Sequence, residues 1–326
     1  MLDGKTVLVT GGSGSFGTKF IEYVLRKSAV RKVIIYSRDE YKQFLMAETY
    51  RDSRLRFFIG DVRDLQRLRM AMREVDIVIH AAAMKHVPIA EYNPMECVKT
   101  NVMGAENVVE AAIGCGVQHV VALSTDKACN PINLYGATKL ASDKVFIASN
   151  NLSGNVGTKF SVVRYGNVVG SRGSVVPLFR RLVAEGAEFV PITDSRMTRF
   201  WITLEQGVEF TLSCLKLMRG GELFVPKIPS MRVVDLAKVI APRLPQKIIG
   251  IRPGEKLHET MITEDDARNT IELSDRYVML SSLLGPRYEI YQSRGKGLSE
   301  TFRYGSDNNS EWLDLKGLEN MLRMAG

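Results

Sequence analysis

A glycine-rich turn between a short strand and a helix is the feature that most constrains this chain. Apolar residues predict a strand over Lys5–Thr10, and an amphipathic pattern predicts a helix that ends near Arg26. Between them, glycines at 11, 14 and 17 allow a tight turn, a close backbone approach to a pyrophosphate, and close packing of helix on strand. The order strand, glycines, helix favours a dinucleotide-binding turn over a purely structural one. The residues expected to contact the dinucleotide here are Gly11, Ser13, Gly14, Ser15, Phe16 and Gly17.

Strand and helix patterns alternate through the first half of the chain. Four further apolar runs predict strands at Lys32–Tyr36, Arg56–Gly60, Asp76–His80 and Val117–Leu123. A long helix is predicted over Asn93–Cys115, in which Asn101 is either a group that orients nearby backbone or a satisfied core residue. This alternation predicts a doubly wound parallel α/β sheet of the Rossmann type. We therefore expect an NADP-binding Rossmann domain over 1–165 and a smaller α/β substrate domain over 166–326, part of which can return to the first sheet.

The residues after the second predicted strand bear on which dinucleotide binds. Open parallel sheets usually place an acid here for the adenosine ribose of NAD. Ser37 and Arg38 come first in this chain, and a hydroxyl with a guanidinium suits the 2′-phosphate of NADP. We therefore expect NADP, although Asp39 keeps NAD open and Arg38 is alternatively a solvated surface charge. Lys42 is grouped with these cofactor-binding residues.

The ends of the third and fourth predicted strands supply further cofactor candidates. Asp61 and Val62 follow the third strand, where an acid can accept a hydrogen bond from the adenine amino group. Asp61 is alternatively the cap of a helix that begins near Leu65. Ala81 follows the fourth strand and is small enough for a dinucleotide to lie close to the backbone. Lys85 is expected at the rim of the active site.

A run of chemically active side chains follows the fifth predicted strand. Thr125, Asp126 and Lys127 stand at the strand end, and Tyr135 and Lys139 are four residues apart on one helical face. A phenol beside an ammonium can act as base on an alcohol whose carbon gives hydride to nicotinamide, and Lys139 can also hold the cofactor ribose. In isolation this spacing is usually an ordinary surface pair, but the glycine turn and the strands upstream favour catalysis. These five residues are the catalytic candidates.

Composition narrows the class of protein further. The 326-residue chain is 45% hydrophobic and 25% charged with a net charge of +8, which suits a globular enzyme with anionic ligands. Its basic residues are interleaved with acids and lack regular aromatics, so no nucleic-acid partner is expected. No apolar run approaches the roughly 18 residues of a membrane span, and no signal-peptide pattern is present, so no membrane partner is expected. Scattered cysteines and histidines predict no metal site, and we interpret the cysteines as reduced thiols of a cytoplasmic protein.

Together these motifs resemble the extended short-chain dehydrogenases/reductases, a family that includes nucleotide-sugar epimerases and dehydratases. The turn from Thr10 to Gly17 and the pair Tyr135 and Lys139 carry that resemblance. The Asp126–Lys127 pair is similar to that of the UDP-N-acetylglucosamine 4,6-dehydratases, and longer stretches resemble the configuration-inverting members. Those stretches are residues 36–40, 58–64, 85–94, 163–177, 197–203 and 252–259. The match runs from residue 1 to about 262, weakens over 263–307 and returns faintly at 308–313.

The resemblance implies an NADP-dependent lyase that converts UDP-N-acetylglucosamine to a 4-keto-6-deoxy sugar nucleotide with inversion at C5. It also implies the first step of pseudaminic acid synthesis, for glycosylation of surface proteins such as flagellin. The membrane-bound relatives carry transmembrane helices and often lack the tyrosine, whereas this chain has Tyr135 and no such helix is expected. Homo-oligomers, hexamers among them, are the assemblies that the resemblance implies.

A UDP-sugar needs cations for its pyrophosphate and polar groups for its sugars. Arg199 and Arg252 are the expected pyrophosphate partners, and Glu255 is the expected acceptor for ribose hydroxyls. From spacing alone the two arginines are as readily surface charges and Asn167 a turn residue; the resemblance over 252–259 favours Arg252. The full set of substrate-binding candidates is Lys85, Asn167, Val175, Arg199, Arg252 and Glu255.

A three-step mechanism is consistent with these residues. Tyr135 takes the 4-OH proton as C4 loses hydride, the 4-ketone acidifies C5–H, and water leaves across C5–C6 before hydride returns to C6. Lys127 is expected to be the C5 base if burial and Lys139 depress its pKa, with Asp126 as acid for the 6-OH and Thr125 bonded to O4. The residues leave open which group reprotonates C5. Alternatives are a UDP-sugar 4-epimerase, a dehydratase that also epimerises C3, and an NADP-sensing regulator.

Overall fold

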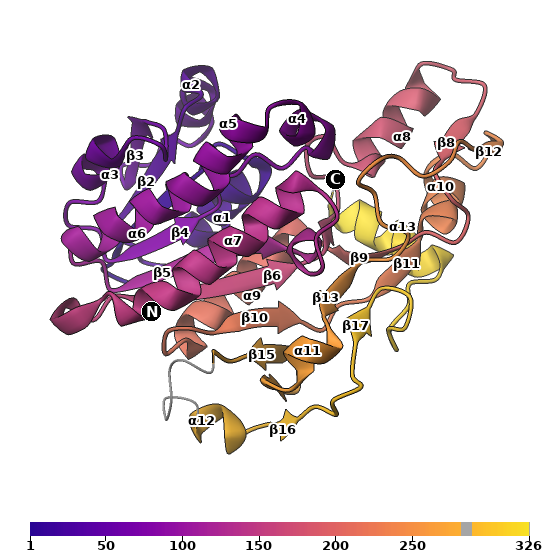
Figure 1. Ribbon diagram of the computed structural model, residues 1–326. Helices are drawn as coiled ribbons and strands as arrows, with labels where there is room; N and C mark the ends of the chain where they lie inside the picture. Colours follow the sequence, from indigo (N-terminus) through magenta and orange to yellow (C-terminus); the bar gives the residue numbers. More distant parts are fainter. Residues whose placement is uncertain (282–288, 326) are drawn as a thin grey trace.

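A single large sheet runs through the centre of the molecule (Figure 1). The computed structural model describes residues 1–281 and 289–325, so 282–288 and 326 of the expected second domain lie outside the described residues. Over the described ranges, ten strands pair in the order β16-β14-β15-β10-β6-β5-β4-β1-β2-β3. They are β1 Thr6–Thr10, β2 Lys32–Ser37, β3 Leu55–Ile59, β4 Ile77–His80, β5 His119–Thr125, β6 Lys159–Tyr165, β10 Leu223–Pro226, β14 Thr270–Glu272, β15 Arg276–Met279 and β16 Lys296–Gly297.

The strands from β3 to β10 in that order run parallel to their neighbours. Parallel strands are covered on both faces and are therefore apolar throughout; every residue of β1 is buried. This is the doubly wound α/β sheet that the alternation of strands and helices predicts. The five predicted strands are all present, and their ends differ from the predicted ones by at most two residues. Strand β5 continues to Thr125, so the first of the catalytic candidates is itself the last residue of a strand.

Helices cover both faces of the sheet (Figure 1). On one face, α1 Ser15–Lys27 lies against α9 Leu204–Leu217. On the other, α3 Leu65–Ala71, α6 Gly104–Gly114 and α7 Leu134–Ala148 pack in a row. The shorter α2 Glu40–Thr49 and α4 Val87–Tyr92 follow β2 and β4. Among the described residues, no helix combines the length and the apolar character needed to cross a bilayer.

The single helix expected between residues 93 and 115 is interrupted. It divides into α5 Pro94–Val98, a π-helical turn η1 Lys99–Met103, and α6. In that turn the buried Asn101 accepts from the backbone N–H of Met84 at 2.8 Å, and its amide donates to the Met84 carbonyl and the Thr138 hydroxyl, each at 3.0 Å. These bonds tie the loop after β4 to α7. A π turn at such a junction is common at functional sites.

A second, smaller core is built from residues after 165. Trp201 and Phe179 are among its fully buried side chains. Its elements are β7 Asn167–Val168, α8 Val175–Ala184, β8 Val190–Ile192, β9 Thr198–Ile202, β11 Ser230–Arg232, α10 Val233–Ile240, β12 Gln246–Ile248 and α13 Leu315–Met324. The same half of the chain supplies β10 and β14 to β16 to the large sheet. The pair β13 Thr260–Ile262 and β17 Tyr304–Gly305 lies between the two, and α11 Glu264–Ala267 follows β13. Helix α12 Glu289–Gln292 lies near β16 at the end of the large sheet, and its Tyr291 is buried in the first core.

Candidate active site

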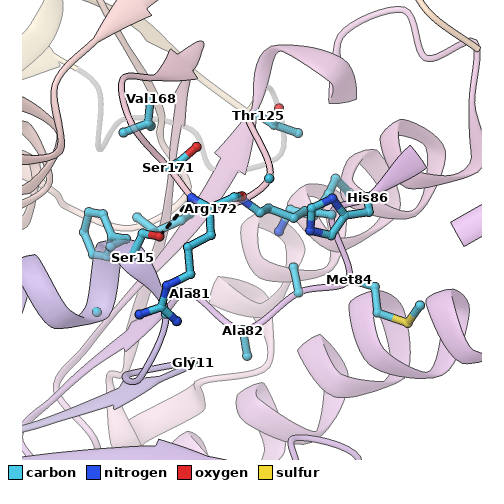
Figure 2. A pocket seen from close by; sticks show the side chains of 18 of the residues that line it. Gly11, Ser15, Ala81, Ala82, Met84, His86, Thr125, Val168, Ser171 and Arg172 are labelled. Carbon is cyan, nitrogen blue, oxygen red and sulfur yellow. Dashed lines mark hydrogen bonds between the residues drawn. The ribbon is translucent and has the colours of Figure 1, made fainter. Parts of the chain in front are cut away.

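A cavity of about 820 Å³ opens at the carboxyl edge of the parallel strands (Figure 2). Its walls are the segments that follow β1, β2, β3, β4, β5 and β6, together with the start of α8. All five catalytic candidates and every cofactor candidate named from the sequence line it. Three of the substrate candidates, Lys85, Asn167 and Val175, also line it. The fold thus brings the catalytic candidates, the cofactor candidates and half of the substrate candidates into one cavity.

The turn after β1 has room only for glycine at two positions. A Cβ on Gly11, whose φ is +66°, would lie 2.9 Å from the Cα of Ala82. A Cβ on Gly17 would lie 2.5 Å from the Cα of Gly12, so α1 packs directly against the turn. Helix α1 begins after Gly14, which has no side chain to cap it, and its first N–H groups are therefore available to an anion. This cradle fits the pyrophosphate of a dinucleotide.

The residues after β2 divide between structural and exposed positions. Asp39 caps α2 by accepting from the backbone N–H of Lys42 at 2.9 Å and also pairs with the Lys42 ammonium. Those hydrogen bonds from Lys42 hold the pKa of Asp39 below its usual value. Arg38, in contrast, is 59% exposed, with its guanidinium 3.6 Å from Asp61. The carboxylate of Asp39 is thus occupied, while the largely exposed Arg38 lines the cavity.

Asp61 lies at the cavity wall after β3 but does not cap the next helix. Both of its oxygens are engaged by Arg63, including guanidinium contacts at 2.9 and 2.7 Å. Burial alone would raise the pKa of Asp61, but the hydrogen bonds from Arg63 lower it. The cap of α3 is instead Asp64, which accepts from the N–H of Arg67. The capping alternative for Asp61 is therefore wrong, because Asp64 directly precedes the helix.

A loop after β7 reaches back over the glycine turn (Figure 2). The backbone N–H of Arg172 donates to the Ser15 hydroxyl at 3.3 Å, and its guanidinium donates to the Ser13 carbonyl at 3.3 Å. Lys85 donates to the Arg172 carbonyl at 3.0 Å from the opposite wall. Burial, Arg172 and Lys127 lower the pKa of Lys85. The loop after β7 therefore brings the Arg172 guanidinium to the glycine turn, and Lys85 supports that loop.

Tyr135 and Lys139 project from α7 at the cavity wall, and both are buried. Burial raises the pKa of Tyr135 to about 12, while the charge of Lys127 and a hydrogen bond with Thr125 act to lower it. Burial lowers the pKa of Lys139, and Asp143 opposes that effect. The sequence assigns Lys139 as the cation beside the phenol; in the structure the charge of Lys127 also acts to lower the pKa of that phenol.

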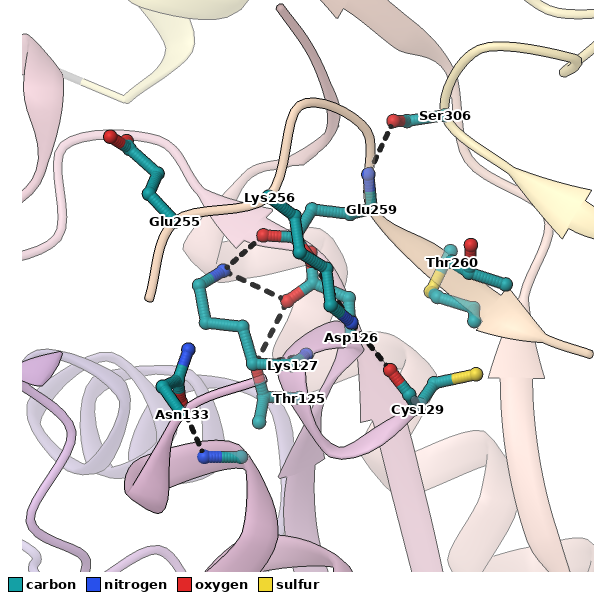
Figure 3. A network of polar contacts seen from close by, with 12 residues as sticks. Thr125, Asp126, Lys127, Cys129, Asn133, Glu255, Lys256, Glu259, Thr260 and Ser306 are labelled. Atoms are coloured by element: carbon teal, nitrogen blue, oxygen red, sulfur yellow. Dashed lines mark hydrogen bonds and ion pairs between the residues drawn. The ribbon is translucent and has the colours of Figure 1, made fainter. Parts of the chain in front are cut away.

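Lys127 is held between two buried carboxylates (Figure 3). Its ammonium lies 3.0 Å from Asp126 and 3.1 Å from Glu259, whose side chains are 1% and 2% exposed. Thr125 donates to the same oxygen of Asp126 at 2.9 Å. Burial alone would lower the pKa of Lys127, but Asp126 and Glu259 outweigh it and raise the pKa above its ordinary value. The expected depression of that pKa is therefore wrong, because the sequence does not show Glu259 beside Lys127.

Three substrate candidates lie away from the cavity wall. Arg199 is 7% exposed, and its guanidinium donates to the carbonyls of Thr198, Leu257 and Lys256 at 2.7, 3.0 and 2.9 Å. It therefore supports the segment before β13. Glu255 lies 3.7 Å from Arg199, and Arg252 is an exposed residue of the same segment.

Sequence motifs alone assign no role to two residues at the site. Arg172 lies within the conspicuous stretch 163–177, and Glu259 closes the stretch 252–259. Both stretches were recognisable as motifs. What the sequence lacked was the pairing of Arg172 with the glycine turn and of Glu259 with Lys127, which only the folded chain provides.

A doubly wound sheet, a glycine cradle after β1 and a phenol–ammonium pair on α7 in one cavity define a dinucleotide-binding protein of the short-chain dehydrogenase/reductase class.

Comparison with known proteins narrows that class. Residues 7–281 match the family model described as polysaccharide biosynthesis protein. A UDP-N-acetylglucosamine 4,6-dehydratase (inverting) from Campylobacter jejuni is 56% identical, over 99% of this chain and 98% of its own. The chain therefore belongs to the polysaccharide biosynthesis protein family, within the extended short-chain dehydrogenases/reductases.

Solved structures agree on the fold. Pen from Bacillus thuringiensis has a TM-score of 0.91 and 38% identity, covering 99% of this chain and 98% of its own. DesIV from Streptomyces venezuelae, a dTDP-glucose 4,6-dehydratase solved with NAD bound, has a TM-score of 0.70 and 25% identity, covering 77% and 86%.

Proposed function

We propose that this protein is a UDP-N-acetylglucosamine 4,6-dehydratase that inverts C5. The observation that carries the proposal is the Asp126–Lys127 pair, joined at 3.0 Å and lining the same cavity as Tyr135. Tyr135 and Lys139 alone suit any hydride transfer to an alcohol carbon; an adjacent acid and base are what an elimination adds. The Campylobacter relative of the same name, 56% identical over nearly the whole chain, supports this choice of substrate and reaction.

The cofactor that we propose is NADP. The cradle at residues 11–17 would hold its pyrophosphate, and Arg38 with Ser37 would face its 2′-phosphate. The occupation of Asp39 as a helix cap supports NADP over NAD, because that carboxylate is less available to ribose hydroxyls. A bound nicotinamide would supply the acceptor for hydride from C4 and the donor of hydride to C6. Because DesIV was solved with NAD bound, a comparison of this protein's affinities for NADP and NAD directly tests the choice of cofactor.

The chain's own residues move the protons. Tyr135 accepts the 4-OH proton, with the charge of Lys127 favouring the phenolate. At rest, Lys127 is the ammonium and Asp126 the carboxylate. Passing one proton from Nζ to Oδ1 across 3.0 Å leaves a neutral amine and a carboxylic acid. The amine then removes the proton from C5, the acid protonates the departing 6-OH, and both residues return to their resting charges as water leaves. Inversion requires that C5 is reprotonated on the opposite face.

The product would enter pseudaminic acid synthesis for the glycosylation of surface proteins such as flagellin. The protein would act in the cytoplasm as a homo-oligomer, a hexamer being one form. Lys85, Asn167 and Val175 would contact the sugar nucleotide from the cavity wall, with Arg252 and Glu255 reaching it from the segment before β13.

The test is incubation of the protein with NADP and UDP-N-acetylglucosamine, followed by mass spectrometry and NMR. A product lighter by one water, with inverted C5, supports the proposal. Consumption without change in mass would indicate a 4-epimerase, and no consumption despite dinucleotide binding would indicate a sensor. Lys127→Ala should bind NADP yet give neither product nor solvent deuterium at C5. Normal turnover in that variant would overturn the role of Lys127.

A further inference from the structure

We propose that Glu259 is a positioning residue of this site, whose buried carboxylate holds the amine of Lys127 in place beside Asp126. The proposal rests on the function given above for Lys127. It assigns a role in the reaction to a residue from a segment remote in the sequence. Figure 3 shows Glu259 and Asp126 each joined to that amine by a dashed line.

The backbone of Glu259 is fixed on both sides. Its N–H donates to the Ser306 hydroxyl at 2.9 Å, and its carbonyl accepts from the Ser306 N–H at 2.7 Å. Strand β13 begins at the next residue and pairs with β17. Further back, Lys256 donates to the Cys129 carbonyl at 2.6 Å, which ties the segment to the turn that holds Lys127. The carboxylate therefore has little freedom to leave the site.

Burial of the Glu259 side chain has a free-energy cost that its contacts must offset. Removing a carboxylate from water costs several kcal/mol unless cations and hydrogen bonds compensate it. One oxygen of Glu259 meets Lys127 at 3.1 Å and lies 3.9 Å from Arg199. The other lies 3.9 Å from Lys256 and, within the described part of the chain, has no hydrogen-bond partner. Lys127 thus supplies the closest contact.

The charges around Lys127 give this arrangement a chemical consequence. Glu259 stabilises the ammonium that forms when the amine takes the C5 proton, and so favours that step. Both carboxylates raise the pKa of Lys127, while burial and Arg199 lower it. The ionisable groups that act on the amine are Asp126, Glu259, Arg199, Tyr135 and Lys85, while Lys256 lies beside the other oxygen of Glu259. Removing one of its two anions should leave the amine less basic.

The test compares Glu259→Gln with Glu264→Gln in the full-length protein. Glu264 is an exposed residue of the neighbouring helix and serves as the matched control. The primary measurement is acetylation of Lys127 at mildly alkaline pH, followed by peptide mass spectrometry with surface lysines as internal reference. Loss of an opposite charge near an amine lowers its pKa by roughly one unit or more. Labelling of Lys127 should therefore rise about tenfold in Glu259→Gln and not in the control.

Turnover gives the second measurement. Glu259→Gln should lower kcat and shift the pH dependence that Lys127 governs to lower pH, with KM for UDP-N-acetylglucosamine unchanged. A purely structural role would not move the pH profile. Glu259→Asp keeps the negative charge at a greater distance from Lys127 and should show a smaller rise in labelling. This variant also tests the proposal if Glu259→Gln does not fold. Labelling of Lys127 equal to wild type in either folded variant overturns the proposal.

The outcomes distinguish a failure of the proposed function from a failure of the role proposed for Glu259. If the wild-type protein releases no water from UDP-N-acetylglucosamine, the proposed function fails, yet the labelling result still decides whether Glu259 holds Lys127. If the wild-type protein is active and the labelling is unchanged, only the role of Glu259 fails.

Discussion

At the scale of single residues, the proposed reaction starts at the phenol of Tyr135. Burial raises its pKa to about 12, so its deprotonation depends on the charge of Lys127 and the hydrogen bond with Thr125. Tyr135→Phe keeps the ring and removes the proton acceptor. We predict that kcat falls roughly 100-fold or more, while dinucleotide affinity measured by fluorescence titration is retained. A variant that still reduces its bound dinucleotide on addition of the sugar nucleotide, seen by nicotinamide absorbance, would contradict this role.

The same scale shows what local sequence can and cannot predict. Thr125, Asp126 and Lys127 were expected at the sheet edge because residues at the end of a buried parallel strand have to lie there. The direction of the pKa shift of Lys127 was not predictable, since it depends on Glu259, which directly precedes β13 and comes from a segment remote in the sequence. A pKa is set by neighbours in space, whatever their distance along the chain.

At the scale of elements, the π turn η1 Lys99–Met103 joins the loop after β4 to α7 through Asn101. Asn101→Ala would leave the N–H and carbonyl of Met84 without these partners. Buried polar groups left unpaired cost about 1–3 kcal/mol each, so we predict a loss of roughly 2 kcal/mol or more in the free energy of unfolding, measured in urea. The exposed Asn151→Ala should change it little. An unchanged urea midpoint for Asn101→Ala would show that the turn is held by other contacts.

The loop after β7 is a second element whose role can be tested. Its Arg172 guanidinium lies at the glycine turn, and its charge acts on Asp39 near the end of β2. We predict that Arg172→Ala weakens NADP binding about tenfold by calorimetry, because a guanidinium contact to phosphate is a charge-assisted hydrogen bond. The matched control is Arg181→Ala, an exposed arginine of α8 that pairs with Glu185. Equal affinity in Arg172→Ala and wild type would exclude contact with the dinucleotide.

Elements also differ in how far the sequence predicts them. The parallel strands were recognisable because each is a continuous apolar run bounded by turn residues. The π turn was not, because its residues continue the helical pattern of 93–115 and the turn depends on Met84 and Thr138 from other segments. Local pattern determines the type of an element, and tertiary hydrogen bonds determine where it is interrupted.

At the scale of the whole molecule, the two halves of the chain are interleaved. Strands β14 to β16 extend the sheet beyond β10, and Leu318 and Leu322 of α13 are buried in the second core. These come from the part of the sequence where the motifs are weakest. Antiparallel additions to a sheet edge are short and weakly patterned, which is why sequence periodicity did not predict their registers.

The strongest test of this interleaving is a chain that ends at Ile262. That truncation removes β14 to β16 from the sheet, β17 from its pairing with β13, α13 from the second core, and Ser306 from the backbone of Glu259. Each loss exposes apolar surface or leaves buried polar groups unpaired, and such costs add across separate sites. We predict that the shortened chain loses cooperative thermal unfolding by circular dichroism and elutes as aggregate in gel filtration, although it retains the whole glycine cradle. A truncated chain that elutes as a compact species, melts cooperatively and binds NADP would show that residues 1–262 fold alone and that the later segments are an addition to a complete domain.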